Sequence, residues 1–178
     1  MQRKTKVITV KQNDPTAEQI ALYGAFAFLY MRSSSHSGVP IGAARLGLQP
    51  PVLLGYCRIF HDQNGVPRAG LTWAMLSDEV EEKFLRGEPL TMGDWTSGSN
   101  FWVMEIIAPF GRPGGAQVMN WLRMEMPKHV TRVRYVRQGM NGKPHRVIEC
   151  NLLENGRAGA RVIKTFTLET GGKDGAVS

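Results

Sequence analysis

The chain has 178 residues, of which 42% are hydrophobic and 21% charged, with a formal net charge of +7 at pH 7. These values lie close to globular averages, exclude a wholly disordered chain and fit one domain with tails. The length is sufficient to enclose a hydrophobic core and a buried catalytic pocket. We expect a flexible arm over residues 1–13, one domain over 14–170 and a flexible tail over 171–178.

The positive charge is concentrated towards the C-terminus. Residues 128–164 hold nine Lys and Arg against two acids, Glu149 and Glu154, and 9 − 2 = +7 equals the net charge of the whole chain. This excess indicates an acidic partner, which is nucleic acid, a membrane surface or an acidic protein. A solvated face that only aids solubility is the alternative. Nucleic-acid binding is the weaker interpretation, because no RRM, KH or helix-turn-helix signature is present.

The two cysteines and the hydropathy pattern indicate a cytoplasmic protein. Cys57 and Cys150 lack CxxC or zinc-ligand spacing and lie in apolar runs, so we expect buried free thiols in a reducing compartment and no metal site. The N-terminus has no signal-peptide pattern. The most apolar stretch, residues 20–31, is about twelve residues long and too short to span a bilayer, so we expect no membrane insertion.

Two helices are predicted at the start of the domain. Asp14 as cap and Pro15 at the first helical position predict a helix that runs to about Met31. Its apolar residues cover most of its circumference, so we expect it to be buried. A second, short helix is predicted over residues 41–48, where Pro50 and Pro51 should end it.

A hairpin and a third helix follow. Residues 52–61 and 68–76 are strand-like, and the polar segment 62–67 between them is typical of a turn. Ser77 then caps a helix whose first turn is acidic, and Gly87 closes it.

The rest of the chain predicts a central strand, one more helix and a set of hairpins. Residues 101–109 are strongly apolar, which favours a central strand, and residues 116–126 have helical spacing. Three β-rich runs follow at 130–137, 145–152 and 161–168, separated by the hairpin dipeptides Asn141-Gly142 and Asn155-Gly156. This order of helices and strands indicates an α+β domain.

Three features could carry chemistry. His36 lies in a polar turn after the first helix and could act as a base near pH 7, although a plain surface histidine is the common alternative. Glu105 lies in an apolar strand, where a carboxylate is costly unless it is paired or used; a structural salt bridge is its alternative. The segment Gly111–Gly115 precedes a helix whose N-terminus could bind phosphate, or it is rich in glycine for geometry alone. Residues 94–98, taken alone, predict a turn.

These segments together resemble one family. Thr72-Trp73-Ala74, Asp94-Trp-Thr-Ser-Gly98 and Trp102-Val-Met-Glu-Ile-Ile-Ala-Pro-Phe-Gly111 are similar to the signature of the RTX-toxin-activating lysine acyltransferases, the hemolysin C-type activators. The resemblance covers roughly residues 20–137. It implies a GNAT-like mixed β-sheet flanked by helices in a single domain, in agreement with the element order.

The resemblance also implies site residues. The catalytic histidine of the family follows a serine by three residues after the first helix, which corresponds to His36 and Ser33. The catalytic carboxylate stands four residues before the proline of Ala-Pro-Phe-Gly. This position is Glu105 here, where the family usually has aspartate. The segment 37–40 lacks the arginine and tryptophan that the family often has after the histidine.

The activity that the resemblance implies is transfer of a fatty acyl group from acyl-acyl carrier protein to internal lysines of an RTX protoxin. The carrier protein's phosphopantetheine thioester would be the donor substrate, with no permanently bound cofactor. The phosphate of that arm could rest at Gly111, Arg112, Gly114 and Gly115, and the basic 128–164 region is a second candidate dock for the acidic carrier protein. A homodimer is compatible with the family.

The mechanism expected from these residues is general-base catalysis. His36 would deprotonate the lysine amine, whose free pKa is about 10.4, and Glu105 would orient the ring and stabilise the imidazolium. Backbone N–H groups of the central strand would bind the oxyanion. Direct transfer is the default, and an acyl-enzyme on Ser33 or His36 is the alternative. The rival functions are a catalytically impaired relative that binds toxin or carrier protein, and an acyltransferase with a non-toxin acceptor.

Overall fold

A computed structural model describes residues 14–127, 129–138, 144–152 and 158–166. They form a single α+β domain with four helices and a six-stranded sheet in the order β1-β2-β3-β4-β5-β6. The helices are α1 (Ala17–Arg32), α2 (Ile41–Leu54), α3 (Asp78–Leu85) and α4 (Arg112–Met124), with a short 3₁₀ helix η1 (Gly93–Thr96). The strands are β1 (Cys57–His61), β2 (Pro67–Leu76), β3 (Asn100–Ile107), β4 (Arg132–Gln138), β5 (Pro144–Leu152) and β6 (Ala158–Thr165).

The sheet is mixed. Among the described strands β3 and β4 are the parallel pair, joined over Phe101–Val103 and Val133–Tyr135, and all other neighbours are antiparallel. A parallel pair needs a crossover connection, which α4 supplies. This architecture is consistent with the GNAT-like mixed sheet flanked by helices that the sequence predicts.

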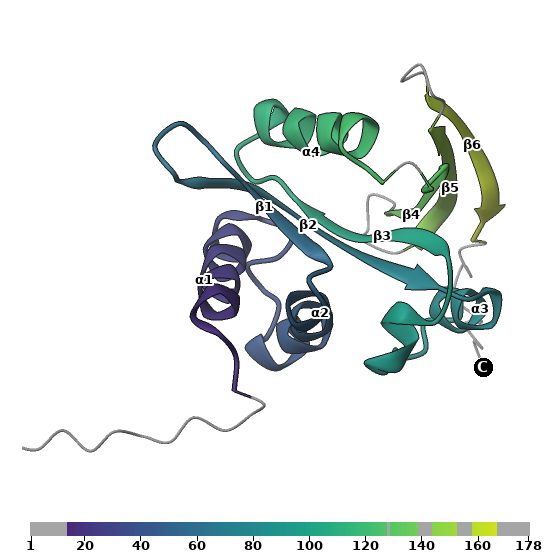
Figure 1. The fold of residues 1–178 in the computed structure, drawn as a ribbon, viewed down its shortest axis with the longest axis horizontal. Coiled ribbons are helices and arrows are strands. Elements are labelled where there is room, and N and C mark those ends of the chain that lie inside the picture. The colour runs from purple at the N-terminus through teal and green to yellow at the C-terminus, as the bar shows by residue number, and fades with distance from the viewer. Residues whose placement is uncertain (1–13, 128, 139–143, 153–157, 167–178) are drawn as a thin grey trace, which may run out of the picture.

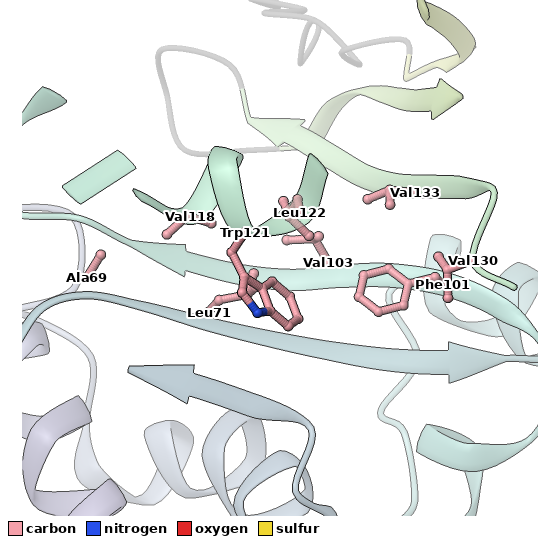
Figure 2. Packing of buried hydrophobic residues seen from close by; sticks show 9 residues of the cluster. All are labelled: Ala69, Leu71, Phe101, Val103, Val118, Trp121, Leu122, Val130 and Val133. Carbon is pink, nitrogen blue, oxygen red and sulfur yellow. The ribbon is translucent and has the colours of Figure 1, made fainter. Parts of the chain in front are cut away.

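The helices cover the sheet unequally. α4 lies on one face, and α1, α2 and α3 lie on the other (Figure 1). The core under α4 consists of side chains from α4, β2, β3 and the β4 region (Figure 2): Ala69, Leu71, Phe101, Val103, Val118, Trp121, Leu122, Val130 and Val133. The opposite face has two smaller cores, one around Phe26 and Leu29 of α1 and one around Trp95 and Trp102.

Strand periodicity explains which side chains of β2 reach the helices α1 and α2. Ala69 and Leu71 point into the core beneath α4, so Gly70 and Thr72 lie on the opposite face. A Cβ at position 70 would lie 2.7 Å from the Phe26 ring, so glycine is what allows α1 to pack this closely. The face of β2 that meets α1 and α2 therefore carries small or polar side chains.

The first helix differs from the prediction in its cap and in its burial. Thr16, not Asp14, is the N-cap, because its hydroxyl accepts from Gln19 N while the Gln19 side chain accepts from Thr16 N, forming a capping box. Phe26 is fully buried, but Ile20 and Met31 are exposed. The prediction of a buried helix was wrong because α1 covers the edge of the sheet with one face only.

The second helix continues through the two prolines. α2 runs to Leu54 and ends at Gly55, which has a φ of 70°. Pro50 and Pro51 are both buried, and this burial stabilises the helix despite the missing N–H donors. The strand predicted over residues 52–61 therefore begins only at Cys57.

Two further expectations concern the second half. α4 begins at Arg112, four residues before the predicted start, so the glycine segment forms its first turn. The strands β4, β5 and β6 confirm the three β-rich runs within a few residues at each end. The arm 1–13, the dipeptides 141–142 and 155–156 and the tail 171–178 lie outside the described residues.

Candidate active site

The turn after α1 and the centre of β3 place the candidate catalytic side chains. Ser33 ends α1, and the backbone N–H groups of His36 and Ser37 both donate to its carbonyl at 3.0 and 2.8 Å. This compact turn aims the His36 ring at the sheet. Glu105 reaches the same side through a bulge in β3: Thr72 pairs with Glu105 and Trp73 pairs with Val103, so Met104 is an extra residue.

The bulge decides which way Glu105 points. Before it, Phe101 and Val103 face the core under α4. With a strict two-residue period Glu105 would face the same way, but the extra residue inverts the alternation and turns Glu105 and Ile107 towards α1. The carboxylate therefore meets the histidine rather than the hydrophobic core.

His36 and Glu105 are in direct contact. The Nε2 atom of His36 lies 3.0 Å from Oε1 of Glu105, and the two side chains are 19% and 24% exposed. The hydroxyl of Tyr30 donates to the other carboxylate oxygen, Oε2, at 2.5 Å, and the Tyr30 and His36 rings meet edge to face with centroids 5.1 Å apart. Burial and the Glu105 carboxylate raise the pKa of Tyr30 far above its usual value, so this phenol stays protonated and holds the carboxylate in place.

The second ring nitrogen of His36 faces two hydroxyls. Ser33 Oγ lies 2.6 Å and Ser35 Oγ 2.9 Å from Nδ1. A carboxylate only accepts hydrogen bonds, so the hydrogen-bond network assigns the proton of the neutral ring to Nε2 and leaves Nδ1 as the acceptor. Nδ1 is thus the basic atom, and a substrate proton must arrive from the side of the serines. Ser33 is buried at 8% exposed, whereas Ser35 is exposed.

Two cavities adjoin this cluster. The larger, about 520 Å³, lies between α1 and α2 and is mostly apolar; His36, Tyr30 and Leu48 are among its lining residues. The smaller, about 270 Å³, lies between α2 and the sheet. Its lining residues are Tyr30, Val39, Ala43, Ala44, Gly47, Thr72, Trp95, Met104 and Glu105. Tyr30, Val39 and Ala44 border both cavities, so the candidate catalytic side chains lie at their junction.

Small residues of α2 keep the smaller cavity open. Ala43, Ala44 and Gly47 are the α2 residues that line it, and none has a side chain larger than a methyl group. A longer side chain at these positions would occupy the space in front of Glu105.

The loop around residues 94–98 supports one wall of the same cavity. The Asp94 carboxylate accepts from Lys83 Nζ at 2.7 Å and from Thr91 N at 2.7 Å. These contacts lower the pKa of Asp94 to about 2. Ser97 Oγ accepts from Ser77 N and donates to the Asp94 carbonyl. These hydrogen bonds, which we call the Asp94 clamp, hold the loop so that Trp95 enters the core, where this residue is only 3% exposed.

The glycine segment at the start of α4 has a packing role. Gly111 caps the helix with a φ of 83°, which favours glycine. A Cβ on Gly114 would lie 2.9 Å from the Arg68 carbonyl, so this glycine permits close contact between α4 and β2, whereas Gly115 has open space around it. Neither cavity beside His36 is lined by Gly111, Arg112, Gly114 or Gly115. Phosphate binding by these four residues stays a prediction.

The structure brings together three of the residues singled out from the sequence, Ser33, His36 and Glu105. Sequence reasoning missed Tyr30 and Ser35, which contact the same groups and stand in no recognisable motif. Trp95 lies in the segment 94–98, which taken alone predicted a turn. The hydrogen-bonding side chains of Asp94 and Ser97 on either side of it are the sequence feature that could have indicated an ordered loop. Cys57 and Cys150 are free but only partly buried, and burial raises the pKa of both thiols, that of Cys57 to about 11.

The described residues also bear on membrane insertion and metal binding. No helix there is long and apolar enough to cross a bilayer. No group of three or more His, Cys, Asp or Glu side chains in that part of the chain could hold a metal ion.

The fold and the site define an α+β domain of GNAT-like architecture with a histidine–carboxylate pair at the junction of two cavities. Residues 15–151 match the RTX toxin acyltransferase family, whose model is named for HlyC, and the chain belongs to this family. It is 30% identical over 128 residues to the protein-lysine palmitoyltransferase CyaC of Bordetella bronchiseptica, covering 71% of this chain and 68% of that protein. It is likewise 30% identical over 118 residues to the lysine-acyltransferase RtxC of Vibrio cholerae, covering 65% and 76%. The protein-lysine myristoyltransferase HlyC of Escherichia coli is 30% identical over 115 residues, covering 64% and 65%.

Proposed function

We propose that the protein is a protein-lysine N6-acyltransferase that moves a fatty acyl group from acyl-acyl carrier protein to internal lysines of an RTX protoxin and so activates it. The observation that carries the proposal is the 3.0 Å contact between His36 Nε2 and Glu105 Oε1 at the junction of the two cavities. Its relatives are named for lysine acylation with palmitoyl and myristoyl groups, which supports lysine as the acceptor and a fatty acyl group as the group transferred.

The first chemical step is removal of a proton from the lysine ammonium. A lysine ammonium is not nucleophilic, and its free pKa is about 10.4, so a base must act near neutral pH. Nδ1 of His36, which contacts the Ser33 and Ser35 hydroxyls, carries the basic lone pair of the ring, and Glu105 compensates the positive charge that the ring gains on protonation. Tyr30 holds the carboxylate without competing for the proton. The pair thus supplies both the base and the charge that stabilises its conjugate acid.

The larger cavity fits an acyl chain. Its walls are mostly apolar side chains of α1 and α2, including Ala27, Met31, Ile41 and Leu48, and His36 also lines it. Burial of methylene groups there would stabilise the bound donor by about 0.8 kcal/mol per CH₂. The thioester at the end of such a chain would come to rest beside the base.

The basic strands β4 and β5 offer a docking surface for the acidic carrier protein. Arg137 and Arg146 are register partners on β4 and β5, and both are exposed. Like charges directly opposite each other destabilise a sheet unless an anion lies between them. Acyl carrier proteins are acidic and occur in the cytosol, where we place this enzyme. By contrast, Arg134 and Arg161 pair with the buried Glu149, which compensates part of their charge, although the Arg161 side chain remains exposed.

The proposal is tested by acyl transfer in a purified system. The full chain is incubated with acyl carrier protein charged with palmitoyl or myristoyl groups and with an RTX protoxin, and intact mass and peptide mapping detect acylated lysines. The His36→Ala variant should lose activity while keeping its circular dichroism spectrum. Absence of acylated lysine with the wild-type chain across both acyl donors would overturn the proposal.

A further inference from the structure

The larger cavity beside His36 follows the first helix. It lies between α1 and α2, which pack against each other on one face of the sheet (Figure 1). Its lining residues on α1 include Tyr23, Ala27 and Met31, which are spaced about one helical turn apart and so lie on one side of the helix. An α-helix rises about 1.5 Å per residue, so these residues extend over roughly 12 Å. The cavity is therefore long enough to hold an extended chain along α1.

One end of this cavity is open and lies beside the candidate catalytic pair. The turn that joins α1 to α2 contributes His36, Ser37 and Val39 to the lining, so this end is at the turn. Two large apolar side chains flank it, and Met31 and Ile41 are 70% and 90% exposed. Exposed apolar surface around a cavity is typical of a binding site for an apolar ligand.

The other end of the cavity is closed by the core. Leu48 is the lining residue of α2 farthest from the turn, and it is only 6% exposed. It belongs to the buried cluster with Phe26, Leu29 and Ile107. Tyr23, the lining residue of α1 farthest from the turn, packs against the same cluster. A chain that enters at the turn would therefore stop against Tyr23 and Leu48.

Ala27 lies between the open and the closed end. It is one turn from Tyr23 and one turn from Met31, and its side chain is only a methyl group. From the end of α1 at Arg32 to Ala27 the helix rises about 7.5 Å. A zigzag chain with C–C bonds of about 1.5 Å advances about 1.3 Å per carbon, so roughly six carbons cover this distance. A short chain thus stops before Ala27, and a long chain passes over it.

We propose that the larger cavity binds the acyl chain with its thioester end at His36 and its methyl end against Tyr23 and Leu48, and that Ala27 limits the length of chain transferred. This inference rests on the acyl transfer proposed above. It adds the orientation of the chain and the residue that sets its length. An apolar cavity that is open beside the base and closed at its far end fits a linear chain attached at one end to a polar carrier.

The test shortens the cavity and measures selectivity among chain lengths. The full chain is assayed with an RTX protoxin and acyl carrier protein that bears hexanoyl, myristoyl or stearoyl groups, and intact mass detects the acylated acceptor. Ala27→Leu adds three carbons where the chain passes, so about three methylenes of a myristoyl group lose their burial. Each should lower kcat/KM about fourfold, so kcat/KM for myristoyl should fall roughly 60-fold relative to that for hexanoyl.

A second variant acts in the opposite direction. Tyr23→Val shortens the side chain at the closed end, so kcat/KM for stearoyl should rise about fourfold or more relative to that for myristoyl. Ala21→Leu is the matched control, because it makes the same change at an exposed position of α1 that lines neither cavity. It should keep the wild-type ratios. Ala27 is itself exposed, so Ala27→Leu should keep the wild-type melting temperature.

The outcomes separate this inference from the proposed function. If the wild type acylates lysine but Ala27→Leu keeps the ratio of myristoyl to hexanoyl transfer within about threefold, the inference is wrong and the acyl transfer stands. An unchanged ratio with a lower sedimentation coefficient would show that a second copy of the chain covers the cavity instead. If Ala27→Leu does not fold, an unchanged stearoyl ratio in Tyr23→Val overturns the inference. A wild type that acylates no lysine with any donor overturns both.

Discussion

The imidazole of His36 and the carboxylate of Glu105 meet at 3.0 Å although they come from the turn after α1 and from the middle of β3. Tyr30 holds one end of this pair through Glu105 Oε2, and Ser33 holds the other through His36 Nδ1. The four side chains form one continuous chain of hydrogen bonds.

Both the length and the charge of the Glu105 side chain should affect kcat for lysine acylation. Glu105→Gln keeps the shape but cannot stabilise the imidazolium, so kcat for lysine acylation should fall by about 10²–10⁴-fold. Glu105→Asp shortens the side chain by one methylene and should also lower kcat, because the 3.0 Å contact with His36 is lost. Steady-state kinetics check both variants. Glu82→Gln, on the exposed side of α3, is the charge-matched control, and equal kcat values for Glu105→Gln and wild type would contradict the role of the pair.

Ser33→Ala should keep most of the activity if transfer is direct. The variant loses one neutral hydrogen bond to Nδ1, which is worth about 1 kcal/mol, so kcat should fall about tenfold or less. Intact mass of the wild-type enzyme incubated with the acyl donor alone should show no added acyl group. Detection of an ester on Ser33, together with complete loss of turnover in the variant, would establish an acyl-enzyme instead.

The clamp at Asp94 should make stability depend on pH in the acid range. Lys83 and the Thr91 N–H depress the folded-state pKa of Asp94 to about 2, below its unfolded value of about 3.9. The stabilisation is therefore present above about pH 4 and is lost as the pH falls towards 2. The urea midpoint of the wild type should drop over this interval. Asp94→Asn should be less stable at pH 7 and show a smaller drop, and an identical pH profile for both would contradict the prediction.

Two adjacent glycines of α4 should respond in opposite ways to alanine. Gly114→Ala places a Cβ about as close as 2.9 Å to the Arg68 carbonyl and should lower the free energy of unfolding by about 1–3 kcal/mol. Gly115→Ala meets open space and should raise it by about 0.5–1 kcal/mol, as expected for a helical position. Urea denaturation measures both. If Gly115→Ala also raises the KM for acyl carrier protein, the phosphate-binding prediction gains support.

The arginine pair on β4 and β5 should govern affinity for the carrier protein. Arg137→Glu should raise the KM for acyl carrier protein and weaken the dependence of binding on salt, because one attractive charge has been reversed. Arg123→Glu, an exposed arginine on α4, is the control with the same charge change. Salt-insensitive binding to the wild type would show that the basic strands are not the dock.

Local signals predicted several elements well. Ser77 caps α3 as its position before an acidic turn predicts, and the polar segment 62–67 closes the β1–β2 hairpin. The apolar run from Phe101 forms the third of six strands and lies inside the sheet. These three predictions are confirmed because caps, turns and apolar runs depend on a few neighbouring residues.

Other elements were decided by packing between distant segments. Pro50 and Pro51 should have ended α2, but their burial outweighs the lost N–H donors. The bulge at Met104 has no local signature, yet it turns Glu105 away from the core under α4. Gly114 lies in the segment predicted to bind phosphate, but a Cβ there would lie 2.9 Å from the Arg68 carbonyl, so helix–strand packing also explains this glycine.

By itself, the sequence determined the α+β class, the family motifs and the candidates Ser33, His36 and Glu105, because residue type and short spacing carry that information. Only the tertiary structure decided that His36 meets Glu105 and that Tyr30 holds the carboxylate. The physical reason is that such contacts join segments far apart in the chain. The burial of the whole core, rather than any local preference, sets their relative position.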